Sequence, residues 1–114
     1  MIRRKKFDGV KKMKPLEWTT HSHFKMREYG LSESRIKRVI NSPERVEEGI
    51  AEGTAAMMQS AGSEKHPYEI WVMVTKEDGA KRVVSAWKYP GKTKPGEPLP
   101  RAIVFELRAA LGAY

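Results

Sequence analysis

The sequence predicts an α+β domain: a small antiparallel sheet of about four strands, two N-terminal helices packed on one face of it, and a C-terminal helix. Two observations favour this class. Before Pro43 the apolar residues recur at helical spacing, whereas after Pro43 they alternate with the period of a strand. The dipeptide Asp78-Gly79 is a strong signal for a two-residue hairpin turn between antiparallel strands. The expected order of elements is therefore β-α-α-β-β-β-β-α.

The first helix is expected from His21 to about Tyr29. Thr20 supplies the hydroxyl of a good N-cap, and Gly30 supplies the C-cap that ends the helix. The residues before it, 16–19, read as a short edge strand. These two caps define the limits of the helix that carries the most distinctive motif of the chain.

The second helix is expected to begin after Ser32, its N-cap, with Glu33 in the first turn, where the helix dipole favours an acid. The sequence Asn41-Ser42-Pro43 ends it. Its apolar stripe consists of Ile36, Val39 and Ile40. This stripe is the face that we expect to pack on the sheet.

The four remaining strands follow in order. Residues 45–51 and 54–60 read as strands joined by a turn at Glu52-Gly53. The stretch 68–75 is the most apolar, so we expect it at the centre of the sheet. Residues 80–89 are expected to pair back on it.

Two irregular segments complete the chain. Residues 61–67 read as a loop, and residues 90–100, which hold four Pro and two Gly, as an extended connector. Pro100 is expected at the start of the final helix. The apolar face of that helix consists of Ile103, Val104, Leu107 and Leu111.

Charge is concentrated at the N-terminus. The chain of 114 residues carries a net charge of +8, and residues 1–14 hold seven cations and one acid, a net +6. We expect residues 1–14 to be a disordered basic tail and residues 15–114 to be one domain. The tail either binds polyanions without sequence preference or only keeps the protein soluble.

Several classes of protein are disfavoured by composition. Without Cys, the chain has no disulfides and no thiolate chemistry. The three His lack the spacing of metal ligands, so we expect no metal site and no cofactor. No apolar run reaches the length of a membrane span, and no secretory signal is visible, so we expect a cytoplasmic protein without a membrane partner.

The first predicted helix carries two His, one Lys and one Arg within seven residues. His21 and Lys25 are spaced i, i+4 and share one face, while His23 and Arg27 share the adjacent face. An imidazole can act as general acid or base near neutral pH, and Lys and Arg can hold phosphate oxygens. We therefore name His21, Lys25, Arg27 and Tyr89 as candidate catalytic residues for RNA cleavage without a metal. Alternatively, His21 only orders the helix start, and His23 and Arg27 form a solvated face.

Four further cations are candidates for nucleic-acid contact. Arg35 and Arg38 are i, i+3 neighbours on the second helix, and Arg82 and Lys88 lie on the last strand. A solvated helix surface is the alternative for the first pair. Alternation puts Val83, Ser85, Trp87 and Tyr89 on one face of that strand, and Arg82, Val84, Ala86 and Lys88 on the other. Trp87 is interpreted as a core residue in preference to a stacking platform for bases.

Three short motifs resemble a group of small, phage-derived bacterial domains of unknown function that are similar to the RelE and BrnT toxins. The matching residues are His21, Lys25, Met26, Arg27, Gly30, Leu31, Ser32, Asn41, Ser42, Pro43 and Val83–Trp87. The resemblance covers roughly residues 16–100. It implies the RelE-like fold, whose characterised members are mostly mRNA-cleaving toxins of toxin–antitoxin pairs. This chain departs from them in lacking an Arg-dense final strand and C-terminus.

Two functions follow from the residues and the resemblance. The first is a toxin-type domain that acts on RNA, in its strongest form as a metal-independent mRNA endoribonuclease. The second is a non-catalytic module that binds nucleic acid or a protein partner. The expected partners are RNA, including ribosome-bound mRNA, and an antitoxin protein.

Overall fold

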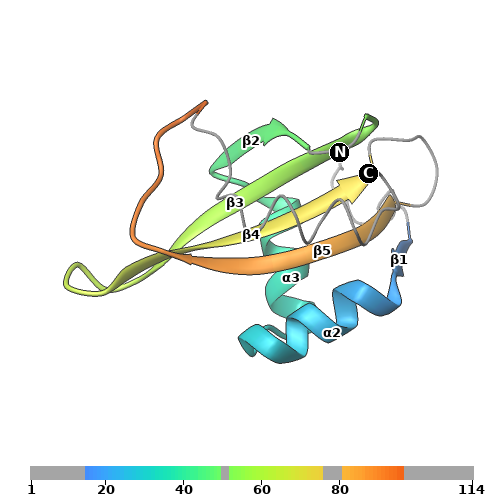
Figure 1. Ribbon diagram of the computed structural model, residues 1–114, viewed down its shortest axis with the longest axis horizontal. Coiled ribbons are helices and arrows are strands. Elements are labelled where there is room, and N and C mark those ends of the chain that lie inside the picture. The colour runs from blue at the N-terminus through green and yellow to red at the C-terminus, as the bar shows by residue number, and fades with distance from the viewer. Residues whose placement is uncertain (1–14, 50–51, 76–80, 97–114) are drawn as a thin grey trace, which may run out of the picture.

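A computed structural model describes residues 15–49, 52–75 and 81–96 (Figure 1). The elements are β1 (Leu16–Trp18), α2 (Thr20–Tyr29), α3 (Glu33–Asn41), β2 (Arg45–Glu48), β3 (Thr54–Gly62), β4 (Pro67–Thr75) and β5 (Lys81–Pro90). The predicted α+β class is confirmed. The basic tail, the Asp78-Gly79 turn and the helix expected after Pro100 lie outside the described residues.

The sheet has five strands in the order β1-β5-β4-β3-β2. The apolar strand β4 is central, as predicted. Both of its faces are covered, which explains why its residues are apolar. The expectation of about four antiparallel strands is corrected: β1 pairs with β5 in parallel, so the sheet is mixed. The short edge strand expected at residues 16–19 is present as β1. The sequence pattern of a strand carries no information on the direction of pairing.

Helix α2 begins one residue earlier than predicted, because Thr19 is its N-cap and Thr20 is its first residue. The Thr19 hydroxyl accepts a hydrogen bond from the Ser22 N–H at 3.0 Å and lies 3.1 Å from the Val83 carbonyl oxygen on β5. The neighbouring Thr would cap equally well in isolation, so contact with β5 decides between them. Gly30 ends α2 in the left-handed conformation, with φ of 69°, as predicted.

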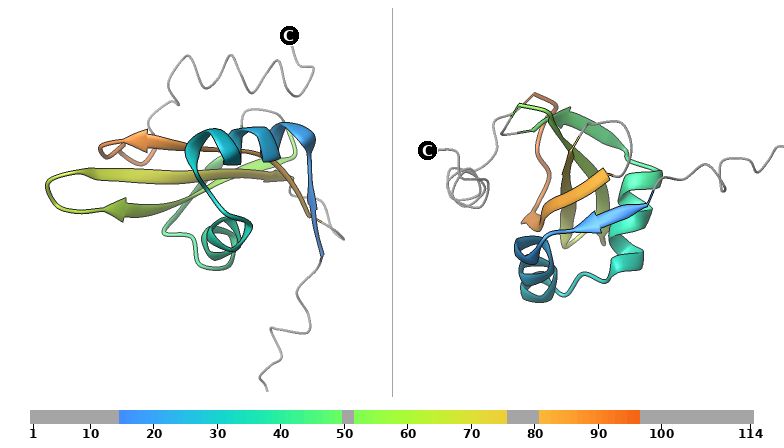
Figure 2. Two further views of the ribbon diagram at one scale, coloured as in Figure 1. Left: turned by 90° about the horizontal axis from the view of Figure 1, so that it is seen from below. Right: turned by 90° about the vertical axis from the view of Figure 1, so that its right-hand side faces the viewer.

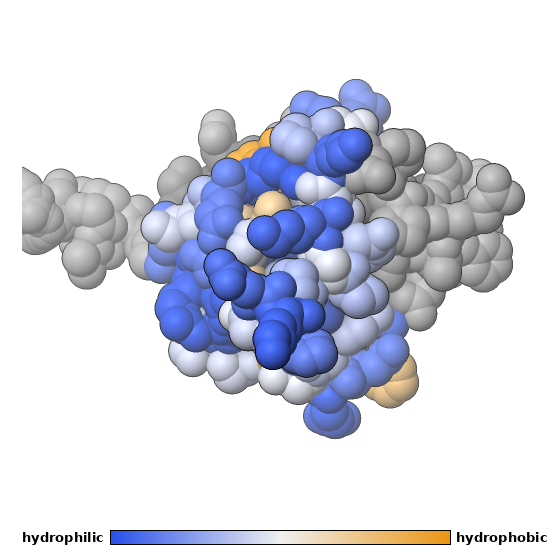
Figure 3. Space-filling view, turned by 90° about the vertical axis from the view of Figure 1, so that its left-hand side faces the viewer, coloured by the Kyte–Doolittle hydropathy of each residue, from blue (hydrophilic) through white to orange (hydrophobic). Residues whose placement is uncertain are grey.

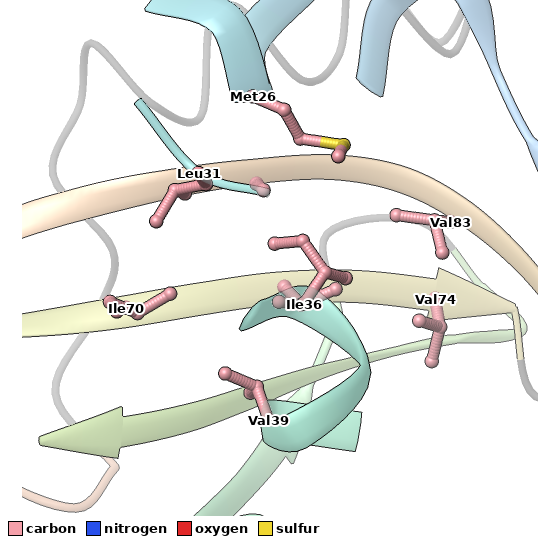
Figure 4. Packing of buried hydrophobic residues seen from close by; sticks show 9 residues of the cluster. Met26, Leu31, Ile36, Val39, Ile70, Val74 and Val83 are labelled. Atoms are coloured by element: carbon pink, nitrogen blue, oxygen red, sulfur yellow. The ribbon is translucent and has the colours of Figure 1, made fainter. Parts of the chain in front are cut away.

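The predicted cap and stripe of the second helix are confirmed. The Ser32 side chain accepts a hydrogen bond from the Arg35 N–H, and Ile36 and Val39 are fully buried. Figure 4 shows these two side chains in one cluster with Ile70 and Val74 of β4. The same cluster includes Met26 from α2, so both helices contribute to one core on one face of the sheet.

Helix α2 lies at the edge of that core, beside strand β5. Strand β1 pairs only with Lys81–Val83, and α2 runs alongside the rest of β5 (Figure 2). Its Tyr29 contacts the apolar clusters of both sheet faces. Helix α2 therefore covers an edge of the sheet that would otherwise expose unpaired backbone groups.

A β-bulge in β5 overturns part of the predicted alternation. Met73 pairs with Ser85 and Val74 with Val83, which leaves Val84 as the extra residue. Val83 therefore joins Ala86 in the helix-side core, and Val84 joins Trp87 in the cluster on the opposite face. The prediction had these two Val residues on the wrong faces, because strict alternation assumes a regular strand.

The opposite face of the sheet carries a second apolar cluster. The rings of Trp71 and Trp87 are parallel, with centroids 6.0 Å apart, and Trp87 is 1% exposed. The preference for Trp87 as a core residue is therefore confirmed. The remaining members of this cluster are Ala56, Met58, Met73 and Val84.

Polar groups on this face hold the segment that follows β5. The buried Glu69 carboxylate accepts hydrogen bonds from the Trp71 Nε1–H at 2.9 Å, from the Thr93 N–H at 2.9 Å and from the Thr93 hydroxyl at 2.8 Å. Arg45 lies over the Trp71 ring and donates to the Thr93 carbonyl at 3.0 Å. The described part of the predicted connector is therefore non-helical, as expected, but it contains a bend and a turn and is fixed to the sheet.

Strand ends differ slightly from the predictions. Strand β3 continues to Gly62, which pairs with Pro67, so the predicted loop shortens to residues 63–66. In β2 the half-buried positions are Arg45 and Glu47, whereas Val46 is 54% exposed. An edge strand such as β2 need not bury its apolar side chains.

Candidate nucleic-acid interface

The inner side of α2 holds two of the predicted catalytic residues. Lys25 is 3% exposed, and its ammonium lies 2.9 Å from the Glu28 carboxylate and 5.3 Å from the centre of the Tyr29 ring. His21 is half-buried, and its Nε2 atom is shielded from solvent. Lys25 therefore already has a counter-charge and a ring contact, and a phosphate could reach it only by displacing Glu28.

The outer side of α2 holds the other cationic residues. His23 and Arg27 are exposed, and the His23 ring lies 5.8 Å from the Trp18 ring. Between them in the sequence stands Phe24, which is 64% exposed. The helix thus divides the predicted motif into an inner pair, the half-buried His21 and the buried Lys25, and an exposed set that includes Arg27.

Tyr89 does not join the α2 residues in one site. It pairs with Glu69 and packs beside the Trp71 and Trp87 cluster, on the face opposite the helix-side core. Its neighbour Lys88 points to the helix side, since Lys88 pairs with Ile70. The prediction that Lys88 and Tyr89 lie on opposite faces is therefore confirmed.

Two of the four predicted nucleic-acid contacts, Arg35 and Lys88, lie near Tyr68, and a third, Arg38, lies close to Arg35. The Lys88 ammonium lies 5.0 Å from the centre of the Tyr68 ring. Arg35 of α3 lies close enough to both Tyr68 and Arg38 to interact with them electrostatically. We call these four residues, Arg35, Arg38, Tyr68 and Lys88, the Tyr68 cluster. Figure 3 shows that the end of the molecule with the β3–β4 hairpin is covered mainly by hydrophilic side chains.

Gln59 of β3 positions the arginines of this cluster. Its amide oxygen accepts a hydrogen bond from Arg35 Nη1 at 2.6 Å, and its amide nitrogen donates to the Arg38 and Ser42 carbonyls. Burial lowers the pKa of Arg35, and the nearby Arg38 charge lowers it further. Two like charges are thus held close together on α3, and binding of an anion would reduce their repulsion.

Arg82 lies apart from the Tyr68 cluster. Its guanidinium makes an exposed ion pair with Glu17 of β1 at 3.4 Å. At the usual rise of a strand, its position on β5 is about 20 Å from Lys88. Arg82 therefore belongs to the opposite end of the strand, although the sequence alone grouped the two residues.

Sequence reasoning missed Phe24, Gln59 and Tyr68. Helical spacing places Phe24 with Thr20, His23 and Arg27, so an apolar residue within a polar face was the available signal. Tyr68 and Gln59 gave no local signal, because their roles depend on strands that pair across the sheet.

No protein-family model, curated protein or solved structure matches the chain. None of the helices within the described ranges is long and apolar enough to cross a membrane.

Proposed function

We propose that the protein is an RNA-directed domain of the RelE/BrnT-like type, which binds RNA through the Tyr68 cluster. The observation that carries this proposal is that Arg35 of α3 and Lys88 of β5 both lie near Tyr68 of β4, with Arg38 close to Arg35. The sequence motifs described above supply the connection with RNA. Binding is the part of this function that the geometry supports best.

The charge of the Tyr68 cluster suits a phosphate backbone. Arg35, Arg38 and Lys88 take part in none of the ion pairs found among the described residues. Their charges are therefore available to replace the counterions that surround nucleic-acid phosphates, which is the main source of non-specific affinity. Arg side chains add a planar fork that can hold a phosphate through two hydrogen bonds.

The candidate catalytic residues support cleavage less well. Lys25 is buried and paired with Glu28, Arg27 faces solvent, and Tyr89 lies on the other side of the sheet. A general acid and a general base must both reach the same ribose-phosphate unit. The described residues do not present such a group of side chains on one surface.

Removing single charges at Arg38 of α3 and at Arg82 of β5 tests the binding site. We expect Arg38→Gln to weaken the binding of a labelled RNA oligonucleotide and to reduce the dependence of log K on log salt by about one unit. The matched control, Arg82→Gln, removes the same charge from an existing ion pair and should have a much smaller effect. Fluorescence anisotropy at several salt concentrations measures both. Equal losses for the two variants, or no binding by the parent, would contradict the proposal.

Endoribonuclease activity is the second candidate, and one observation favours it. His21 and Lys25 lie one turn apart on the side of α2 that runs along β5. If these residues are catalytic, His21→Ala should reduce the rate of RNA cleavage by about a hundredfold or more, the usual share of a general acid or base. Purified protein is incubated with RNA in the presence and absence of ribosomes. RNA that stays intact under both conditions would exclude this activity and leave the binding function.

A further inference from the structure

The outer face of α2 has an unusual combination of side chains. Thr20, His23, Phe24 and Arg27 follow the spacing i, i+3, i+4, i+7, and all four are exposed. Phe24 is the only Phe, Tyr or Trp in the described part of the chain that is mostly exposed. A single exposed apolar residue needs no explanation by itself. An exposed aromatic ring between an imidazole and a guanidinium is a more specific arrangement.

A second aromatic ring extends this face. Trp18 of β1 lies against His23, with ring centroids 5.8 Å apart and an interplanar angle of 32°. Trp18 is held by its contact with the helix-side core, so His23 rests on a fixed support. The face therefore presents flat π-surfaces on a helix that is itself anchored to β5 through Thr19.

The acidic residues near this face are already paired. Glu28 binds the Lys25 ammonium at 2.9 Å, and Glu17 binds Arg82 at 3.4 Å. His23 and Arg27 take part in none of the ion pairs found among the described residues. In the sequence, residues 1–14 add a net charge of +6 immediately before β1. The local electrostatics thus favour a partner that is a polyanion.

We propose that the outer face of α2 is a stacking platform for unpaired nucleobases, with Phe24 as its central ring. Single-stranded nucleic acid is bound by aromatic side chains that stack on bases, together with cations that follow the backbone. Phe24 provides the ring, and Arg27 provides a cation on the same helix face. This inference rests on the proposed RNA-directed function and adds that the RNA is unpaired where it crosses α2.

Substitutions at Phe24 separate stacking from charge. We expect Phe24→Leu, which keeps an apolar side chain but removes the ring, to weaken binding of an unstructured RNA oligonucleotide about fivefold or more. Phe24→Tyr should restore the affinity, because it restores the ring. Val46→Ala changes the other large apolar side chain that is exposed within the described ranges, on strand β2, and serves as the control. The dependence of binding on salt should be the same for Phe24→Leu and the parent, because no phosphate contact is removed.

The partner is tested with three probes: the unstructured oligonucleotide, a duplex of equal length, and poly-L-glutamate. We expect Phe24→Leu to weaken binding of the unstructured oligonucleotide and to leave duplex binding unchanged. Parent protein that binds RNA with an affinity unaffected by Phe24→Leu would overturn this inference while leaving the proposed function in place. Parent protein that binds no RNA would overturn both. Equal affinity for poly-L-glutamate, with equal sensitivity to Phe24→Leu, would overturn the inference in favour of an acidic protein partner.

Discussion

Replacing Ile36 by Ala is expected to lower the free energy of unfolding by about 2–5 kcal/mol. Ile36 is fully buried, and it lies between Val39 on its own helix and Ile70 and Val74 on the central strand (Figure 4). Removal of its side chain leaves a cavity in a core that both helices help to build. Urea denaturation followed by circular dichroism measures the loss.

The control for this prediction is Val46→Ala, which shortens an aliphatic side chain that is 54% exposed. We expect a change within about 0.5 kcal/mol, as for most surface substitutions. If the two variants lose similar stability, the helix-side core is not the main source of stability. The placement of α3 under β4 would then need revision.

Glu69→Ala is the second substitution with a large expected effect, because one carboxylate holds three donors. The Trp71 indole and the backbone and hydroxyl groups of Thr93 all donate to it. A buried donor left without its acceptor costs roughly 1–3 kcal/mol. We therefore expect a loss of stability greater than that of Thr93→Val, which removes only the hydroxyl. Urea denaturation measures the stability of both variants.

A matched control for Glu69→Ala is Glu64→Ala, because Glu64 is an exposed acid in the loop 63–66. It should leave stability unchanged within about 0.5 kcal/mol. Tryptophan fluorescence provides a second measurement, since Glu69 contacts the Trp71 ring nitrogen. A Glu69→Ala variant with the stability and emission of the parent would show that residues 91–96 are not held by this carboxylate.

The sequence predicted the local features of the fold well. Gly30 and Ser32 cap their helices as expected, and the most apolar stretch is the central strand. Each of these features depends on residues that are close together in the chain. The choice of Thr19 over Thr20 as N-cap, and the bulge at Val84, depend on contacts between distant segments, so no local pattern could reveal them.

The candidate site was predicted less completely, for the same reason. Helical spacing placed His21 beside Lys25, but it could not show that β5 covers this side of α2 and leaves Phe24 outside. Similarly, Arg35 and Lys88 are far apart in the sequence, and both come near Tyr68 only because β3, β4 and β5 pair in register. Charge and residue type identified the cations, and the topology of the sheet decided which of them act together.

The parallel pairing of β1 with β5 has a consequence for the order of events during synthesis. The Thr19 hydroxyl and the Val83 carbonyl are 64 positions apart in the chain, so α2 cannot dock until translation has passed the last strand. Closure of such a long loop is slow compared with the formation of local hairpins. We therefore expect α2 to be undocked in nascent chains that stop before Lys81. Limited proteolysis of ribosome-bound nascent chains would detect the undocked helix.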